Sequence, residues 1–144
     1  MTERHRVKLA VYLIPRDGNR VLLSLRRNTG WKDGWFSLVA GHVEAGEAAE
    51  ESMIREAKEE AGIVVNPDDL RHVYTLHRMG DGEYIDLFFE CKRWSGEIHN
   101  AEPEKCGEVC WVQLGTLPEN TLTYVREVLE HYSQGETYAS TRSC

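Results

Sequence analysis

Residues 41–63 of this chain read GHVEAGEAAEESMIREAKEEAGI, and this stretch decides the fold. Its glutamate-rich part predicts a helix over about residues 47–61. Successive helical residues are rotated by about 100°, so Glu59 lies roughly 60° to one side of Glu56 and Glu60 roughly 40° to the other. The three carboxylates would share one face, where like charges at i, i+4 cost about a few tenths of a kcal/mol. A bound cation would turn that cost into binding energy.

The other features of the stretch suit a metal-binding helix packed on a sheet. All-oxygen ligands select a hard ion such as Mg²⁺, which also binds substrate phosphates, with Mn²⁺ as the alternative. Ile54, Ala57 and Ala61 form a narrow apolar stripe away from the carboxylates. Gly62 suits a helix C-terminal cap, and Gly41 lets the backbone approach an ion or a phosphate closely. The competing interpretation is an ordinary solvated acidic helix face.

Length and composition indicate one small globular protein. The chain has 144 residues, of which 41% are hydrophobic and 28% are charged. We expect one domain over residues 1–134 and a disordered tail over residues 135–144. The net charge of −7 argues against a nucleic-acid polymer as partner, because neutralising its phosphates needs a basic surface.

The N-terminus and the cysteines indicate the compartment. The first six residues are followed by a mostly apolar run over residues 7–14, which has the length of a strand and is too short for a membrane span. Four cysteines lack the spacing of a disulfide scaffold, so we expect reduced thiols. These features predict a cytoplasmic protein with no membrane partner, acting as a monomer or homodimer.

The order of apolar and turn-forming segments predicts an α/β protein with a mixed sheet and two helices. A hairpin turn is expected at residues 80–83, and Pro118 with Asn120 suggests where the second helix starts. The expected strands cover residues 7–14, 21–25, 35–39, 70–75, 84–92 and 109–112, and the helices cover 47–61 and 118–132.

The quoted stretch also follows a spaced pattern, G-x5-E-x7-R-E-U-x-E-E-x-G-U, in which U is a mostly aliphatic position. Gly41 opens it, Glu47 and Arg55 follow at the stated intervals, and Gly62 with Ile63 closes it. This pattern resembles the Nudix box of hydrolases that cleave nucleoside diphosphates linked to another group. Ala57 departs slightly, since a larger aliphatic is usual there. The resemblance implies an α/β/α sandwich with a mixed β-sheet between helices.

The resemblance also implies roles for the residues of the box. Glu56, Glu59 and Glu60 would bind the divalent metal, together with the backbone carbonyl of Ala40. Arg55 would orient the glutamates, partly through Glu47. We therefore assign catalysis to Glu56, Arg55, Glu59 and Glu60, with Glu56 as the first candidate for the base that receives a proton from water.

A further acid on a later loop often completes such sites. The alignment of Arg93-Trp94-Ser95-Gly96-Glu97 with the corresponding strand end of MutT-type proteins places Glu102 there, as a metal ligand and second candidate for the base. Its neighbour Glu104 stays open as the alternative.

Residues 100–106 and 109–112 resemble MutT-like nucleotide pyrophosphatases, and most of all the mammalian branch that acts on purine nucleoside triphosphates, so the resemblance predicts a preference for purine triphosphates over ADP-ribose. Arg26 lies fifteen residues before Gly41, where MutT carries an arginine that contacts substrate. Asn120 lies near a position that presents a side chain to the base, and a helix N-cap is the alternative role for it. A second substrate-contacting arginine of MutT has no counterpart, which counts against specificity for oxidised guanine.

The resemblance predicts Mg²⁺-dependent hydrolysis of a nucleoside (deoxy)triphosphate to the monophosphate and pyrophosphate. ADP-ribose or another nucleotide sugar is the alternative substrate, because the box accounts for the diphosphate chemistry and leaves the flanking groups open. A third possibility is a non-catalytic nucleotide-binding module. Such modules commonly lose box glutamates, and this chain keeps them all.

Overall fold

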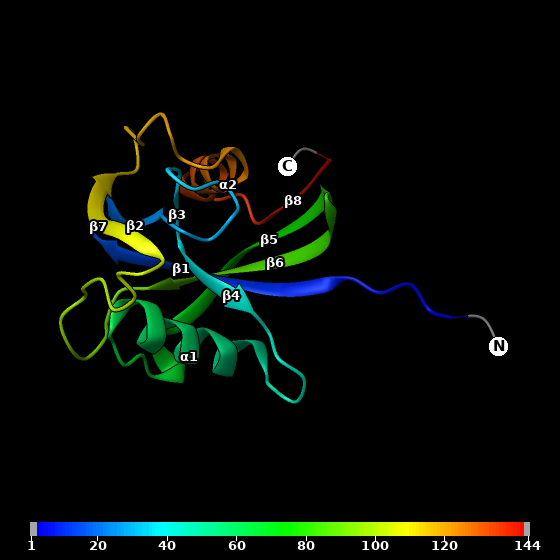
Figure 1. Ribbon diagram of the computed structural model, residues 1–144, viewed down its shortest axis with the longest axis horizontal. Helices are drawn as coiled ribbons and strands as arrows, with labels where there is room; N and C mark the ends of the chain where they lie inside the picture. Colours follow the sequence, from blue (N-terminus) through cyan, green and yellow to red (C-terminus); the bar gives the residue numbers. More distant parts are fainter. Residues whose placement is uncertain (1–2, 143–144) are drawn as a thin grey trace.

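The computed structural model describes residues 3–142, which fold into one mixed sheet with a helix on each face (Figure 1). The helices are α1 (Ala49–Ala61) and α2 (Thr123–Ser133), with a short 3-10 turn, η1 (Pro67–Asp69). The strands are β1 (Lys8–Asp17), β2 (Arg20–Arg26), β3 (Phe36–Ser37), β4 (Val39–His42), β5 (Leu70–Gly80), β6 (Gly82–Cys91), β7 (Cys106–Gln113) and β8 (Tyr138–Thr141). The expected α/β/α sandwich is confirmed.

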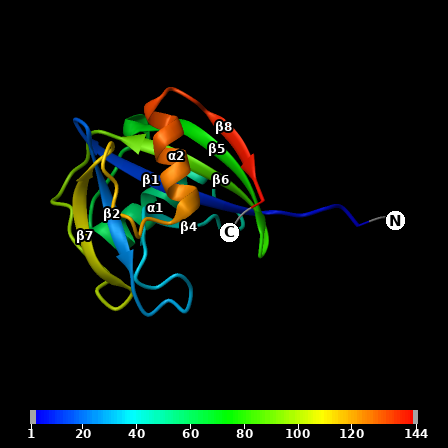
Figure 2. The ribbon, with the colours of Figure 1, turned by 90° about the horizontal axis from the view of Figure 1, so that it is seen from above.

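The sheet runs in the order β3-β2-β1-β6-β5-β8. Strand β1 lies at its centre, parallel to β6 and antiparallel to β4, and β7 pairs with β2. The predicted hairpin joins β5 to β6 and brings Gly80 opposite Gly82. Seen from above, α2 lies across the middle of the sheet, and β7 runs beside β2 at one side (Figure 2).

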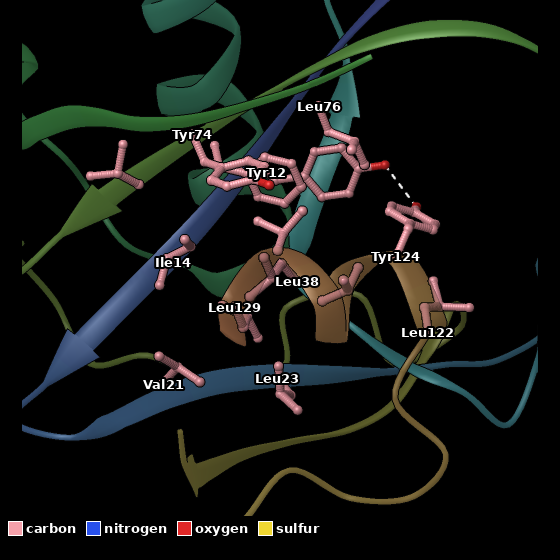
Figure 3. Packing of buried hydrophobic residues seen from close by; sticks show 14 of the residues in the cluster. Tyr12, Ile14, Val21, Leu23, Leu38, Tyr74, Leu76, Leu122, Tyr124 and Leu129 are labelled. Carbon is pink, nitrogen blue, oxygen red and sulfur yellow. Dashed lines mark hydrogen bonds between the residues drawn. The ribbon is translucent and has the colours of Figure 1, made fainter. Parts of the chain in front are cut away.

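Each face of the sheet has its own hydrophobic core. On the α2 side, Tyr12 packs with Tyr124 and Leu129 among residues from β1, β2, β5 and α2, and the Tyr12 and Tyr124 hydroxyls hydrogen-bond at 2.8 Å (Figure 3). On the α1 side, Ala57 and Ala61 are fully buried, as their positions on the apolar stripe predict. Met53 is fully buried there as well, whereas Ile54 is only half-buried.

Helix α1 ends as the glycine predicts. Gly62 has φ +69°, and its N–H donates to the carbonyl of Lys58. Only glycine adopts this left-handed conformation without a steric cost. Gly62 therefore ends the helix directly after the glutamate-rich segment.

The expected disordered tail is wrong for residues 138–141, which form β8 along the edge of β5. Gly135, with φ +83°, turns the chain back after α2, and the backbone N–H of Thr75 donates to the carbonyl of Thr137. Added backbone pairing orders a polar segment that cannot form a core of its own. Residues 143 and 144 lie outside the described residues, and the extent of the domain over residues 1–134 stays a prediction.

Two other boundaries differ from expectation. The segment predicted as one strand over residues 35–39 is two short strands, because the chain changes partner at Leu38 from β2 to β1. Helix α2 begins at Thr123, so Asn120 is not its N-cap; Leu122 occupies that position. No helix within residues 3–142 is long and apolar enough to cross a membrane.

Candidate active site

An open cavity of about 460 Å³ lies between α1, β2, β4 and the loop before β7. Its lining brings together every residue that the sequence assigned to catalysis or metal binding, with Arg26 from the predicted substrate contacts. They are Arg26, Ala40, Arg55, Glu56, Glu59, Glu60 and Glu102. Glu44 lines the cavity as well, so five carboxylates share it, and we call it the acidic pocket.

Arg55 is hydrogen-bonded to three of the box glutamates. Its Nε donates to Glu47 at 2.8 Å and its Nη2 to the other oxygen of Glu47 at 3.1 Å. Its Nη1 donates to Glu56 at 2.9 Å and lies 3.4 Å from a carboxylate oxygen of Glu59. The guanidinium is thus fixed by Glu47 on one side and holds two cavity carboxylates on the other, which is the orienting arrangement that the resemblance implied.

The pKa of Glu60 is perturbed by its surroundings. Burial raises the pKa of its carboxyl well above the usual value, and the hydrogen bond and charge of Glu56 raise it further. A hydrogen bond from the backbone of Ala40 opposes the shift. Burial and the neighbouring carboxylate therefore favour the protonated form of Glu60 when no metal ion is bound.

Gly41 explains how β4 and α1 approach so closely. A Cβ built on Gly41 would lie 2.2 Å from the Cδ and from Oε1 of Glu56. The carboxylate therefore occupies the space of a missing side chain, which no other residue type would leave open.

Glu102 reaches the pocket because its loop is fastened to the end of α1. The backbone N–H of His99 donates to the carbonyl of Ala61, and that of Ala101 donates to the carbonyl of Glu60, both at 3.1 Å. The Asn100 side chain then accepts from the Glu102 N–H at 3.1 Å. Glu104, the alternative that the sequence left open, does not line the acidic pocket; it lines an adjoining hollow that shares Glu102 and Lys105 with that pocket.

The oxygen donors fit a hard divalent cation. The set consists of carboxylates and a backbone carbonyl at Ala40, and the ion would displace the proton that burial favours on Glu60. Within residues 3–142, however, no three His, Cys, Asp or Glu side chains already form a metal-binding cluster. The proposed ligands thus line one cavity, but their side chains are not already arranged around a single metal position.

A second cavity of about 420 Å³ opens beside the first, on the α2 side of the sheet. Arg26, Ser37 and Ala40 line both cavities, so the two adjoin. The second cavity is rich in aromatic side chains, and we call it the aromatic pocket. The residues that line this cavity and not the first are Ala10, Tyr12, Trp31, Gly41, His42, Arg78, Asp81, Tyr84 and Tyr124.

The two predicted substrate contacts fare differently. Arg26 lies at the junction of the pockets, where its Nε donates to the carbonyl of Trp31 and its guanidinium stacks 4.9 Å from the Trp31 ring centroid. Asn120 lines neither pocket, and its amide donates to the carbonyl of Gly34 at 2.8 Å. The structure therefore does not bring Asn120 to the site.

Arg78 and Asp86 are the polar residues that sequence reasoning missed. They occupy positions on the same sheet face as Tyr74, Leu76 and Phe88, and both are buried. The sequence did contain a signal for this pair. Arg78 and Asp86 are opposite charges at positions where two strands joined by the predicted hairpin otherwise carry apolar residues.

Comparison with known proteins identifies relatives for nearly the whole chain. A family model described as NUDIX domain matches residues 4–132. An ADP-ribose pyrophosphatase from Methanocaldococcus jannaschii is 35% identical over 108 residues, which are 74% of this chain and 62% of that protein. A NAD-capped RNA hydrolase NudC from Photobacterium profundum is 30% identical over 113 residues, 78% of this chain and 40% of that protein. The chain thus spans less than two thirds of the length of these two relatives.

Solved structures share the fold. A MutT NUDIX hydrolase from Burkholderia pseudomallei has a TM-score of 0.80 at 22% identity, covering 88% of this chain and 98% of that one. A MutT protein from Methanosarcina mazei Go1 has a TM-score of 0.76 at 23% identity, covering 92% of this chain and 97% of that one. At these identities the likeness establishes the fold alone.

Proposed function

The chain belongs to the NUDIX domain family, and from this premise we propose that it is a Mg²⁺-dependent pyrophosphohydrolase of nucleotides. The preferred reaction is hydrolysis of a nucleoside triphosphate to the monophosphate and pyrophosphate. The observation that carries the proposal is the junction of the two cavities at Arg26 and Ala40. Phosphates would lie in the acidic pocket, where a cation neutralises its carboxylates, and the nucleoside would lie in the aromatic pocket.

The metal ligands in this proposal are Glu56, Glu59, Glu60, Glu102 and the carbonyl of Ala40. Mg²⁺, or Mn²⁺ in its place, would supply stabilisation of the charge that gathers on the phosphate oxygens. Glu56 is the first choice to receive the proton of the attacking water, because its carboxylate is held in a fixed position. Nη1 of Arg55 donates to it at 2.9 Å, and it packs against the backbone of Gly41. Glu102 is the second choice.

Two residues bring positive charge to the phosphate path. Arg26 lies between the pockets, where it would contact the phosphate chain of a nucleotide that spans both. Arg55 keeps the carboxylates oriented through Glu47 and so preserves the geometry on which charge stabilisation depends. In contrast, the contacts of Asn120 favour a structural role, so we no longer assign base recognition to it.

A nucleotide sugar is the second candidate substrate. The Methanocaldococcus relative is named an ADP-ribose pyrophosphatase, and the first NudC relative is named a NAD-capped RNA hydrolase. The acidic pocket would serve either diphosphate equally. A NAD-type diphosphate at the end of an RNA is therefore included among the test substrates, although the net charge of −7 favours small nucleotides over polymers.

The test is a screen of nucleoside triphosphates, ADP-ribose, NAD and a NAD-capped RNA with Mg²⁺ or Mn²⁺, with chromatographic identification of both products. We expect pyrophosphate and a monophosphate from a triphosphate, with kcat/KM above that for ADP-ribose. A tenfold advantage for ADP-ribose would replace the triphosphate proposal. Stoichiometric nucleotide binding without turnover would instead indicate a binding module.

The cysteines bear on where the protein acts. We propose a cytoplasmic protein, supported by the buried free thiols of Cys91 and Cys106, and a monomer or homodimer in solution.

A further inference from the structure

A buried ion pair forms part of the aromatic pocket. Arg78 on β5 is 9% exposed and Asp86 on β6 is 0% exposed. Nε of Arg78 donates to one Asp86 oxygen at 2.7 Å, and Nη2 lies 3.4 Å from the other. A buried charge pair of this kind is expensive to desolvate, so burial alone gives no reason to prefer it over apolar residues.

Two tyrosine rings pack against the Arg78 guanidinium. Its Cζ lies 4.2 Å from the ring centroid of Tyr84 and 4.4 Å from that of Tyr124. The Tyr124 hydroxyl is in turn hydrogen-bonded to Tyr12. The ion pair with Asp86 and the two ring contacts together hold the guanidinium in place.

One edge of this rigid group is left for a ligand. Arginine has five N–H donors, and Asp86 takes the side that carries Nε and one N–H of Nη2. The pair with Asp86 does not use Nη1. The end that carries Nη1 and Nη2 therefore retains two parallel donors, and Arg78 lines the aromatic pocket.

We propose that Arg78 is a specificity-determining residue that donates two hydrogen bonds to O6 and N7 of a guanine base in the aromatic pocket. This inference rests on the proposed function, whose nucleoside it places and identifies. A fixed pair of parallel donors matches two adjacent acceptors in one plane, and the O6 and N7 edge of guanine is the pairing that arginine makes most often with bases.

The alternatives present poorer partners to such a donor pair. Adenine has an amino group where guanine has O6, so one donor of Arg78 would meet another donor. The oxidised base 8-oxoguanine carries a hydrogen on N7 and loses that acceptor. Asp86 cannot compensate, because Arg78 already occupies its carboxylate. Arg78 would therefore select unmodified guanine.

The first test uses the unaltered protein and changes the substrate. With Mg²⁺, we expect kcat/KM for GTP to exceed that for 7-deaza-GTP, which lacks only the N7 acceptor, by about tenfold or more. ITP keeps O6 and N7 and lacks the 2-amino group, so its kcat/KM should stay within about threefold of that for GTP. Equal rates on GTP and 7-deaza-GTP would overturn the proposal.

The second test changes the protein. Arg78→Lys keeps a cation beside Asp86 but loses the planar pair of donors, so the ratio of GTP to 7-deaza-GTP should fall to about threefold or less. The rate on 7-deaza-GTP should change little, whereas a merely structural defect would lower both rates together. Arg71→Lys is the matched control, because Arg71 lies exposed on the same strand. If Arg78→Lys retained the full ratio of GTP to 7-deaza-GTP, the assignment would be contradicted. If Arg78→Lys failed to fold, the comparison of GTP with 7-deaza-GTP on the unaltered protein would decide.

A binding measurement separates this inference from the proposed function. Calorimetry without metal should give a dissociation constant for GMP about tenfold lower than for 7-deaza-GMP. Absence of hydrolysis of every triphosphate would refute the proposed function while that preference could persist. Conversely, hydrolysis of all triphosphates with no preference in either assay would refute the role of Arg78 alone.

Discussion

Arg55 and Glu47 form a two-bond ion pair, with Nε and Nη2 of the arginine 2.8 Å and 3.1 Å from the two carboxylate oxygens. The bond from Arg55 is the main reason that the pKa of Glu47 falls to about 2, and the backbone N–H of Glu44 adds to it. Glu47 therefore stays ionised well below the ordinary pKa of a glutamate and anchors the group that orients Glu56.

This pair predicts how stability depends on pH. The Glu47 pKa is depressed by folding from 4.5 to about 2, so its contribution is fully present above about pH 4.5 and is lost as the pH falls toward 2. Urea unfolding midpoints should show Glu47→Gln less stable than the parent at pH 6, with the difference shrinking between pH 4.5 and 2. A difference that is the same at every pH would show that the ionised carboxylate is not what stabilises the fold.

Arg55→Lys should impair catalysis more than folding. A lysine supplies one point charge and cannot hold Glu47 and Glu56 together through separate nitrogens. We expect kcat to fall by about tenfold to a hundredfold, with a small change in Tm. Lys58→Gln is the control, since Lys58 is an exposed cation of the same helix. The measurement is steady-state kinetics. An unchanged kcat in Arg55→Lys would show that Arg55 has no role in catalysis.

Gly41→Ala tests whether the close contact of β4 with Glu56 matters. The new methyl carbon would lie 2.2 Å from the Glu56 carboxylate, which has to move away. Displacement of a ligand by about 1 Å is enough to cost about a hundredfold in rate, so we expect a loss of that order and a higher Mg²⁺ concentration for half-maximal activity.

Gly115→Ala is the matched control, because a Cβ there meets no atom within 4 Å and Gly115 has no left-handed φ. It should leave both Mg²⁺ activation and Tm unchanged. Equal Mg²⁺ activation curves for the two variants would show that Glu56 tolerates displacement.

The helix and its carboxylate cluster were predictable because both depend on local periodicity. The rotation of about 100° per residue places Glu56, Glu59 and Glu60 together in any helix over this stretch, and Gly62 ends it. Arg26 was placed by its spacing from Gly41, and it does line the acidic pocket.

The aromatic pocket was not predictable in the same way, because it depends on strand register. Arg78 meets Asp86 only when β5 pairs with β6 so that Leu76 lies opposite Asp86. Likewise, the amide of Asn120 bonds to Gly34, which lies 86 positions away in sequence, and no local pattern indicates that partner. Strand β8 is ordered by pairing with β5, although its own composition is typical of a mobile tail.

Removal of the metal should abolish hydrolysis, and Glu60→Gln should lower kcat by at least about a hundredfold. Glu60 lies in hydrogen-bonding contact with Glu56, so a neutral amide removes a ligand charge that the metal would need. The metal-free variant should not have a lower Tm than the metal-free parent. Without metal the Glu60 carboxyl already favours its neutral form, and the amide that replaces it can still donate to Glu56.

The control is Glu50→Gln, which neutralises an exposed acid in the first turn of the same helix. It should retain activity and Mg²⁺ dependence. Tm is measured with and without EDTA, and kcat with Mg²⁺, for the parent and both variants. Undiminished turnover in EDTA would overturn metal dependence, and full activity of Glu60→Gln would take Glu60 out of the ligand set. A lower Tm of metal-free Glu60→Gln would show that the carboxyl of Glu60 stabilises the fold in a way that an amide cannot replace.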